Sequence, residues 1–478
     1  MQAKPEQPTI ILATSNGVGM GHLARATAIG LALKNRANPI IISMASAVAE
    51  IPEATGIPAE YITGRDRGLM SRYKWDKYLR DRILALVEET GATILTFDGV
   101  VPYPGILAAK IAKPDLTLVW IRRGLWQKKP QRFVLGMQSK IMDYVIEPGD
   151  YARAYDRGPT SKRKEAKLVA PVSLFRTAVA LDKKTAKLKL GLDVNRPAVL
   201  VQLGTGDADV NQKMHAALSG LIGWKDLQVV LTKEPKDKNG NSLAPAGLDL
   251  KVVRYFPLAD LLNAFDAGIC AAGYNGVHEL LAAGLPTVFV SNIRGTDDQE
   301  TRARWCADNG AALMADQSNL PDIERTVKKL QDPILRIALS NKCLDLPAPS
   351  GANEIAEFLL KISKSTIANR IRKSVQYRSF SVLEILGKKP IDAVKHLIVF
   401  FLEKVGLSYR VLFPHKKTTP QITGAPIYSQ TIKTEELRAL IAAPRRFEHL
   451  YPESSEKYIY ARRAIANTAY DLNKGNRT

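Results

Sequence analysis

The chain has 478 residues, of which 46% are hydrophobic and 24% charged, and a formal net charge of +21. This length is sufficient for two or three domains that each bury a core, and the charge favours an extended, anionic partner, for which nucleic acid and an anionic membrane are the two candidates. Three cysteines, Cys270, Cys306 and Cys343, lie far apart without a C-x-x-C pair, which argues against a disulfide framework and a zinc site. We therefore expect a reducing compartment and a buried Cys270.

The basic charge gathers near the end of the chain. Residues 361–478 contain 22 lysines and arginines against 9 acidic residues, a net charge of +13. Residues 383–413 mix apolar and basic positions at near-helical spacing, which favours an anionic membrane surface over nucleic acid, since no nucleic-acid motif is present. The structural alternative for residues 391–413 is a helix that packs back across the domains. Residues 1–8 lack the regions of a signal peptide, and the apolar run at 397–402 is far below the ~20 residues of a spanning helix. We expect a cytoplasmic protein, peripheral at the inner face of a membrane.

Aliphatic strands alternate with helical stretches through the first 360 residues, which is typical of the α/β class. The first strands are expected near Ile10, Ile41, Ile94, Leu118 and Val145. The polar, turn-rich stretch 151–165 is typical of a linker or loop. The sequence thus predicts a first doubly wound domain over residues 1–165.

Three alternating glycines follow the first predicted strand. Gly17, Gly19 and Gly21 precede a helix that opens at His22 and has apolar positions three and four apart. Such a loop brings backbone N–H groups close to a bulky or anionic ligand. The G-x-G-x-G spacing, with no Lys-Ser/Thr pair and no acidic residue after the next strand, disfavours both a dinucleotide fingerprint and a Walker loop.

A candidate base lies at the same edge of the predicted sheet. His22 has the ordinary pKa that suits a general base near neutral pH. Asp98, at the end of a strand, is a candidate to orient His22 or to bind an acceptor hydroxyl. The structural alternatives are that His22 only hydrogen-bonds the glycine loop and that Asp98 is a turn carboxylate before Gly99.

A second α/β series follows the linker. Its strands are expected at 199–201, 229–231, 252–253, 268–270 and 287–290. We predict a second doubly wound domain over residues 166–362 and a basic extension over residues 363–478. Two such domains enclose a cleft at the carboxyl ends of both sheets, where ligands bind in open α/β folds.

The segment 271–303 carries the clearest ligand-binding pattern. Gly273 precedes a predicted helix whose first amides and dipole favour a diphosphate by ~0.3–1 kcal/mol at an exposed site. Asn275 and Glu279 share one helix face, where a carboxylate can accept both hydroxyls of a ribose. The loop Gly204-Thr205-Gly206 adds further amides. These features together indicate a nucleoside diphosphate.

Basic residues follow the strand near Leu118. Arg122 and Arg123 lie in a segment with two tryptophans and three further basic side chains, residues 120–132. A solvated basic loop accounts for such a run. The functional alternative is an acceptor site for a lipid-linked phosphate or an anionic polysaccharide, which arginine would hold in fork geometry.

One block of the sequence resembles a known family. The block is Gly273-Tyr274-Asn275-x-x-x-Glu279-x-x-x-x-Gly284-x-Pro286, followed by Asp298-Gln299. It resembles the donor-binding signature of the GT-B glycosyltransferases of family 28, which include the peptidoglycan N-acetylglucosaminyltransferase and plant monogalactosyldiacylglycerol synthase. Gly17-x-Gly19-x-Gly21-His22 is similar to the acceptor-side glycine loop of that family, and the resemblance covers about residues 9–360.

The resemblance implies two Rossmann-like domains, a nucleotide-sugar held mostly by the second, an acceptor held by the first, inversion at the anomeric carbon and no required metal. It implies that Glu279 binds the ribose, that Gly273, Asn275 and the loop 204–206 lie by the diphosphate, and that Gln299 touches the transferred sugar. Asp298, the residue before Gln299 in the same block, is a further candidate donor-binding residue. Asp297-Asp298-Gln299 departs from the His-Gln-Gln of the peptidoglycan enzyme, so the sugar preference of that enzyme does not carry over.

We therefore expect a hexosyltransferase that takes a sugar from a nucleotide-diphospho-sugar. The expected donor is a UDP-linked sugar, with UDP-GlcNAc as the first candidate. The expected acceptor is lipid-linked or a cell-envelope polysaccharide. His22 and Asp98 are the candidate catalytic residues, and no cofactor is expected beyond the co-substrate. Two alternatives stay open: a nucleotide-sugar epimerase on the same fold, and a non-catalytic sugar-nucleotide-binding assembly subunit.

Overall fold

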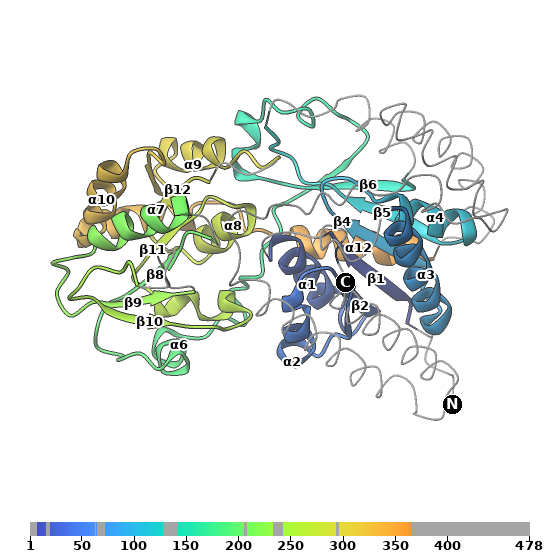
Figure 1. Cartoon of the computed structure of the whole chain (residues 1–478), viewed down its shortest axis with the longest axis horizontal. Helices are drawn as coiled ribbons and strands as arrows, with labels where there is room; N and C mark the ends of the chain where they lie inside the picture. Colours follow the sequence, from blue (N-terminus) through green and yellow to red (C-terminus); the bar gives the residue numbers. More distant parts are fainter. Residues whose placement is uncertain are drawn as a thin grey trace, which may run out of the picture.

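The protein is built on two separate parallel β-sheets. The computed structural model shows them side by side, each packed between helices (Figure 1). This confirms the predicted α/β class with two doubly wound domains. The structure describes residues 7–15, 20–62, 64, 72–127, 142–204, 208–232, 242–292 and 296–364.

The first sheet has seven strands in the order β3-β2-β1-β4-β5-β6-β7. Its central strands are nearly continuous apolar runs because both faces are covered. Helix α1 (Gly21–Leu33) packs on one face, and α3 (Arg72–Thr90) and α4 (Pro104–Ala112) pack on the other. The strands are β1 Thr9–Thr14, β2 Asn38–Ser43, β3 Ala59–Tyr61, β4 Ile94–Asp98, β5 Thr117–Ile121, β6 Tyr144–Pro148 and β7 Lys167–Val169.

The second sheet has six strands in the order β10-β9-β8-β11-β12-β13. Its strands are β8 Ala198–Gln202, β9 Gln228–Leu231, β10 Asp249–Val252, β11 Ala267–Cys270, β12 Thr287–Val290 and β13 Leu313–Ala315. The helices around it are α6 Lys183–Leu190, α7 Ala208–Ser219, α8 Tyr274–Ala282, α9 Gln299–Asp308, α10 Leu320–Lys328 and α11 Pro333–Leu344. As predicted, Cys270 is buried, and so are the other two cysteines.

Each sheet has a point at which the strand order reverses. In the first sheet this point lies between β1 and β4, where Thr14 pairs with Asp98. In the second it lies between β8 and β11, where Gln202 pairs with Cys270. Open α/β sheets bind their ligands beyond the carboxyl ends of the strands at such switch points. The loops after these four strands are therefore the places to look for chemistry.

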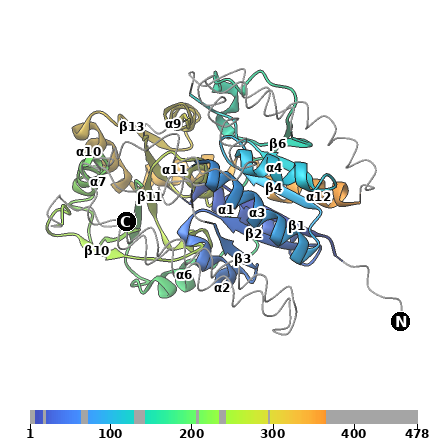
Figure 2. The ribbon, with the colours of Figure 1, turned by 45° about the vertical axis from the view of Figure 1, so that its right-hand side comes forward.

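Helix α12 (Gly351–Ser363) returns from the second domain to the first, where it packs on α1. Figures 1 and 2 both show it among the elements of the first sheet. The Phe358 ring meets the Tyr144 ring edge to face at 5.2 Å. Gly351 is required at the crossing, because a Cβ there would lie 2.0 Å from the carbonyl oxygen of Ala170.

The structure corrects two predicted domain boundaries. The first sheet extends beyond residue 165, because β7 pairs with β6 as its last strand. This strand is short and half exposed, so it lacks the apolar run by which the other strands were recognised. Helix α12 lies within the range predicted for the second domain but packs on the first domain. The predicted extension lies outside the described residues, except for its first two positions.

The described part of the chain contains no helix whose length and apolar content would allow it to cross a bilayer.

Candidate functional site

His22 and Asp98 lie together at the switch point of the first sheet. His22 is in the first turn of α1, directly after β1, and Asp98 is the last residue of β4. The imidazole Nδ1 lies 2.6 Å from Oδ1 of Asp98. The Asp98 side chain is 1% exposed and that of His22 is 19% exposed. The structure thus brings the two candidate catalytic residues into direct contact, with the imidazole still reachable.

Arg25 is part of the same cluster, although it was not predicted from the sequence as a site residue. Its Nε donates to Oδ2 of Asp98 at 2.8 Å and its Nη2 donates to Oδ1 at 2.6 Å. Arg25 follows His22 by three positions, so the two share a face of α1. That spacing is the signal by which Arg25 could have been found.

The contacts of the imidazole favour one tautomer. A carboxylate can only accept hydrogen bonds and a guanidinium can only donate them, so Nδ1 either donates to Asp98 at 2.6 Å or accepts from Nη2 of Arg25 at 2.9 Å. The shorter contact to Asp98, together with the two hydrogen bonds that Arg25 already donates to that carboxylate, favours the proton on Nδ1. Nε2 then carries the lone pair that a general base needs. Burial, Arg25 and Arg123 lower the pKa of His22 and Asp98 raises it, with burial the largest influence and a lowered pKa as the net result. This lowered pKa favours the neutral imidazole at pH 7.

The second domain contributes helix α8 to the same place. Gly273 is the N-cap residue of α8, and among the described residues no side chain caps this helix end. Asn275, in the first turn, donates from Nδ2 to the carbonyl oxygen of Gly21 at 2.9 Å, across the two domains. The buried Oδ1 of Asn275 has no hydrogen-bond partner among the described residues. We call the region where these loops of the two domains meet the domain junction.

The loop after β8 lies beside α8. Gly204 has a φ of +96°, a conformation that favours glycine. Asn292, after β12, donates from Nδ2 to the carbonyl oxygen of Leu203 at 2.8 Å. The amide N–H of Asn292 donates in turn to Oε1 of Gln299 at 2.9 Å. Gln299 is thereby held toward Gly273, where a Cβ would lie 3.9 Å from its Nε2.

A buried ion cluster joins the domains around Asp297. Arg123, after β5, places Nη1 2.5 Å from Oδ1 of Asp297, and Arg302 of α9 places Nη2 3.1 Å from the same atom. Arg302 also donates from Nε to Oδ2 of Asp150 at 2.8 Å. Burial by itself raises the pKa of Asp297, but Arg123 and Arg302 lower it to about 2. The cluster keeps Asp297 ionised between two loops of different domains.

Tyr274, the first residue of α8, connects these groups. Its hydroxyl donates to the carbonyl oxygen of Gly149 at 2.8 Å and accepts from the N–H of Val172 at 2.9 Å. The guanidinium of Arg25 lies 5.0 Å from the centre of its ring and that of Arg302 lies 5.8 Å away. The ring thus lies close to two arginines of different domains.

The structure corrects the expectation for Arg122. Its side chain is fully buried and pairs with Glu147 at 3.1 Å and Glu165 at 2.7 Å, so it does not face an acceptor. The strand end explains the difference: successive side chains point to opposite faces, and only Arg123 turns toward the domain junction.

The expectation for Asp298 is corrected as well. Its carboxylate caps α9, accepting from the N–H of Thr301 at 3.1 Å and from the Thr301 hydroxyl at 2.9 Å. Both carboxylate oxygens are therefore engaged in holding the start of the helix. Four predicted site residues lie outside the described part of the chain: Gly17, Gly19, Thr205 and Gly206.

Glu279 lies one turn after Asn275 on the same face of α8 and is partly exposed. Burial raises the pKa of Glu279 to about 8, against a lowering influence from the backbone hydrogen bond of Leu174, and Asp260 raises it further. In the free protein this carboxyl is therefore mostly protonated at neutral pH. A carboxyl with this pKa is atypical of structural surface positions and marks a candidate binding residue.

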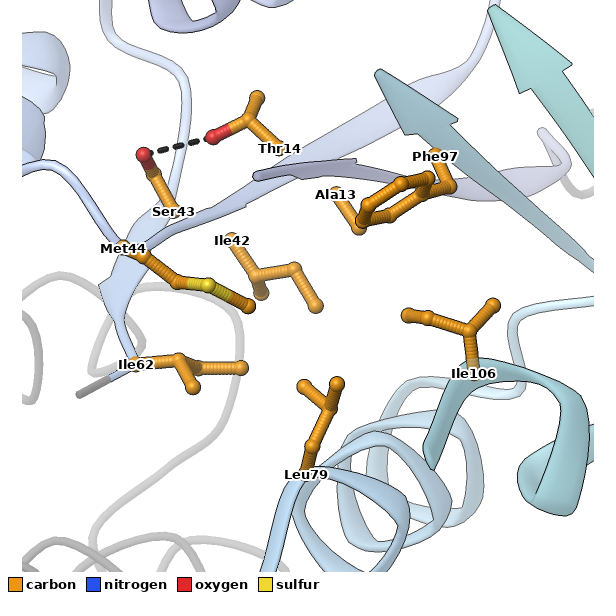
Figure 3. Close-up of a pocket in the computed structure, with 9 residues that line it drawn as sticks. All are labelled: Ala13, Thr14, Ile42, Ser43, Met44, Ile62, Leu79, Phe97 and Ile106. Atoms are coloured by element: carbon orange, nitrogen blue, oxygen red, sulfur yellow. Dashed lines mark hydrogen bonds between the residues drawn. The ribbon is translucent and has the colours of Figure 1, made fainter. Parts of the chain in front are cut away.

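A small apolar cavity lies on the other face of the first sheet, between the strand ends and helices α3 and α4. Its lining includes the hydroxyls of Thr14 and Ser43, which bond to each other at 2.7 Å (Figure 3). The remaining lining residues are hydrophobic, and Figure 3 shows their side chains pointing into the space. This cavity has no polar groups left to hold a diphosphate.

Residues 198–358 match the glycosyltransferase family 28 C-terminal domain. This region of the chain is therefore similar to that domain. The match runs from β8 into α12, so the matched region includes Gly204, the start of α8, Glu279 and Gln299.

Two relatives carry the name UDP-N-acetylglucosamine–N-acetylmuramyl-(pentapeptide) pyrophosphoryl-undecaprenol N-acetylglucosamine transferase. The protein of Nocardioides sp. is 31% identical over 193 residues, 38% of this chain and 52% of the relative. That of Xanthomonas oryzae pv. oryzae is 26% identical over 381 residues, 74% of this chain and 79% of the relative. The chain spans about half the length of the curated relatives with 31% identity.

The solved structure of the kitacinnamycin glycotransferase resembles the whole two-domain arrangement. It has a TM-score of 0.53 and 16% identity, and the alignment covers 75% of this chain and 99% of that one. At this identity the likeness concerns the fold, and it agrees with the predicted GT-B arrangement.

The raised pKa of Glu279 predicts how stability depends on pH. The folded protein keeps a proton on Glu279 up to about pH 8, whereas the unfolded chain loses it near the ordinary value of 4.5. The wild type should therefore lose stability as pH rises through this window. Glu279→Gln cannot ionise, so its melting temperature should gain on that of the wild type as pH rises from about 5 to about 9. Thermal melts of both proteins, with the exposed Glu300→Gln as control, measure this. Parallel pH curves for wild type and E279Q would contradict the raised pKa.

Proposed function

We propose that this chain is an inverting, metal-independent glycosyltransferase that uses a UDP-linked sugar, with UDP-GlcNAc as the first candidate, and a lipid-linked or polysaccharide acceptor. The observation that carries the proposal is the meeting of His22 with the uncapped start of α8 at the domain junction, bridged by the Asn275–Gly21 hydrogen bond. The relatives' printed names, which describe a UDP-GlcNAc donor and a pyrophosphoryl-undecaprenol acceptor, support this choice of substrates.

The proposed reaction is a single displacement at the anomeric carbon. The acceptor hydroxyl attacks from the face opposite the diphosphate, and the bond between the anomeric carbon and the diphosphate oxygen breaks. The hydroxyl proton passes to Nε2 of His22, and the diphosphate leaves with the electron pair. Asp98, in contact with Nδ1, holds the imidazole in place while Nε2 takes up the proton.

The second domain would hold the donor. Glu279 would receive the ribose hydroxyls, and the amides that begin at Gly273 would receive the diphosphate together with the loop 204–206. Asn275 presents an unpartnered amide oxygen, which suits a hydroxyl donor on the substrate. Gln299 would contact the transferred sugar from its position opposite Gly273.

The leaving diphosphate needs positive charge at the domain junction. The dipole of α8 supplies part of it, and Arg123, on the acceptor side, lies close enough to influence the pKa of His22. These groups support a transfer that needs no metal.

We also propose a peripheral position at an anionic membrane surface. It is supported by the net charge of +13 over residues 361–478, since each basic residue near an anionic surface contributes about 1 kcal/mol.

Donor binding should stabilise the wild type and not Glu279→Ala. A ligand at about 100 times its Kd raises the free energy of unfolding by ~2.7 kcal/mol, which a thermal melt detects. The panel is UDP, GDP, dTDP, CDP and their sugar forms, with NAD as a negative control and Glu300→Ala as the matched variant. No stabilisation by any nucleoside diphosphate would sink the donor proposal. Incubation of UDP-GlcNAc without acceptor tests the epimerase alternative: an epimerised sugar would favour that enzyme.

Replacing the proposed base should slow transfer without weakening donor binding. His22→Ala is expected to lower kcat by about 10²- to 10⁴-fold, the usual contribution of general acid–base catalysis. Asp98→Asn should also lower kcat, because the amide no longer fixes the tautomer. Radiolabelled sugar transfer in membrane extracts measures both, with the exposed His215→Gln as control. Wild-type turnover by H22A would show that the base has been misassigned.

Deleting residues 383–478 should weaken binding to vesicles that contain anionic lipid, and added salt should weaken binding of the full chain. Co-sedimentation with anionic and with neutral vesicles measures the effect. Binding that is equal for both chains and insensitive to salt would remove the membrane proposal.

A further inference from the structure

Arg25 occupies both oxygens of the Asp98 carboxylate. Its side chain is 3% exposed, and the two hydrogen bonds, 2.8 Å from Nε and 2.6 Å from Nη2, form a fork. The same Nη2 lies 2.9 Å from Nδ1 of His22. Paired planar contacts of this kind fix both the position and the charge of a carboxylate.

The fork changes the electrostatic environment of the His22 imidazole. A lone buried carboxylate 2.6 Å from an imidazole would favour the imidazolium, whose Nε2 holds a proton and cannot accept another. With Arg25 bound, the charges of guanidinium and carboxylate nearly cancel, while the oxygen that accepts from Nδ1 stays in place. Asp98 can then orient His22 without protonating it.

The other charged groups near His22 come from three elements. Arg123, after β5, adds positive charge and is itself paired with Asp297, which precedes α9. Tyr274 of α8 covers the guanidinium of Arg25 with its ring, 5.0 Å from the ring centre, so that the second domain closes this side of the cluster. None of these groups supplies a second carboxylate in contact with His22 among the described residues.

We propose that Arg25 is a positioning residue that keeps His22 neutral by holding both oxygens of Asp98, with the Tyr274 ring completing its site from the other domain. The role of His22 as base rests on the proposed function, whereas its charge state can be measured without any substrate.

Removing Arg25 has a defined direction. Burial and Arg25 lower the pKa of His22, and Asp98 raises it. Without the guanidinium, only burial and Arg123 still oppose the Asp98 charge, so the pKa of His22 rises. A residue with a merely structural role would lower activity at every pH and leave this pKa where it is.

The first test is an NMR titration of the histidine side chains in the full-length protein, with His22→Gln to assign the signal. Arg25→Gln should raise the pKa of His22 by about one unit or more. Arg25→Lys keeps the charge but not the fork, so the pKa should stay near that of the wild type. An unchanged pKa in R25Q would overturn the proposal.

The second test is the pH profile of kcat/KM for sugar transfer. In R25Q its acidic limb should move to higher pH in step with the NMR value, because a base must be unprotonated to act. R25K should keep the wild-type midpoint with kcat about tenfold lower, since Asp98 is held less firmly. Should R25Q fail to fold, R25K still decides, because an unchanged kcat would show that the fork is not needed. A shifted NMR pKa in a protein that transfers no sugar would support the charge argument and refute the proposed function.

Discussion

The carboxylate of Asp297, 13% exposed and paired with two arginines, links the two domains at their junction. It lies between Arg123 of the first domain and Arg302 of the second, and its low pKa keeps it charged. A buried charge is tolerated only when it is paired, and removing one partner of such a pair usually costs about 3–5 kcal/mol. The loops that carry these three side chains therefore cannot separate without exposing them to water. The placement of His22 opposite α8 depends on this constraint.

The two sheets contribute different groups to the domain junction around that cluster. Each sheet presents its switch point, one with an imidazole and a carboxylate, the other with an uncapped helix start and a glycine in a left-handed conformation. Among the described residues, the His22–Asp98 pair and the uncapped start of α8 come from different halves. They meet where the two domains touch, and the Asn275–Gly21 hydrogen bond marks that contact.

Much of this could be predicted from the sequence because apolar strands and helical periodicity are local signals. The contact between His22 and Asp98 was also within reach, since both follow strands whose carboxyl ends share one edge. Arg25 and Arg302 were missed because a basic residue in a helix usually faces water, and their buried partners come from distant segments. Sequence also could not distinguish between neighbouring residues of similar type. Arg122 and Arg123 are adjacent, as are Asp297 and Asp298, and the backbone conformation decides which side chain of each pair faces the domain junction.

The return of α12 has a mechanical consequence. The chain passes between the domains twice, after β7 and again before α12, and the two passages touch where Gly351 packs against Ala170. Two connections at one place tie the domains together at that edge, so the second domain cannot move away from the first there without breaking this contact. Because α12 packs on the first sheet, the described part of the chain ends, at residue 364, on the half that carries His22. A force applied through that end would act first on the first domain and would reach the second domain only through this edge and the domain junction.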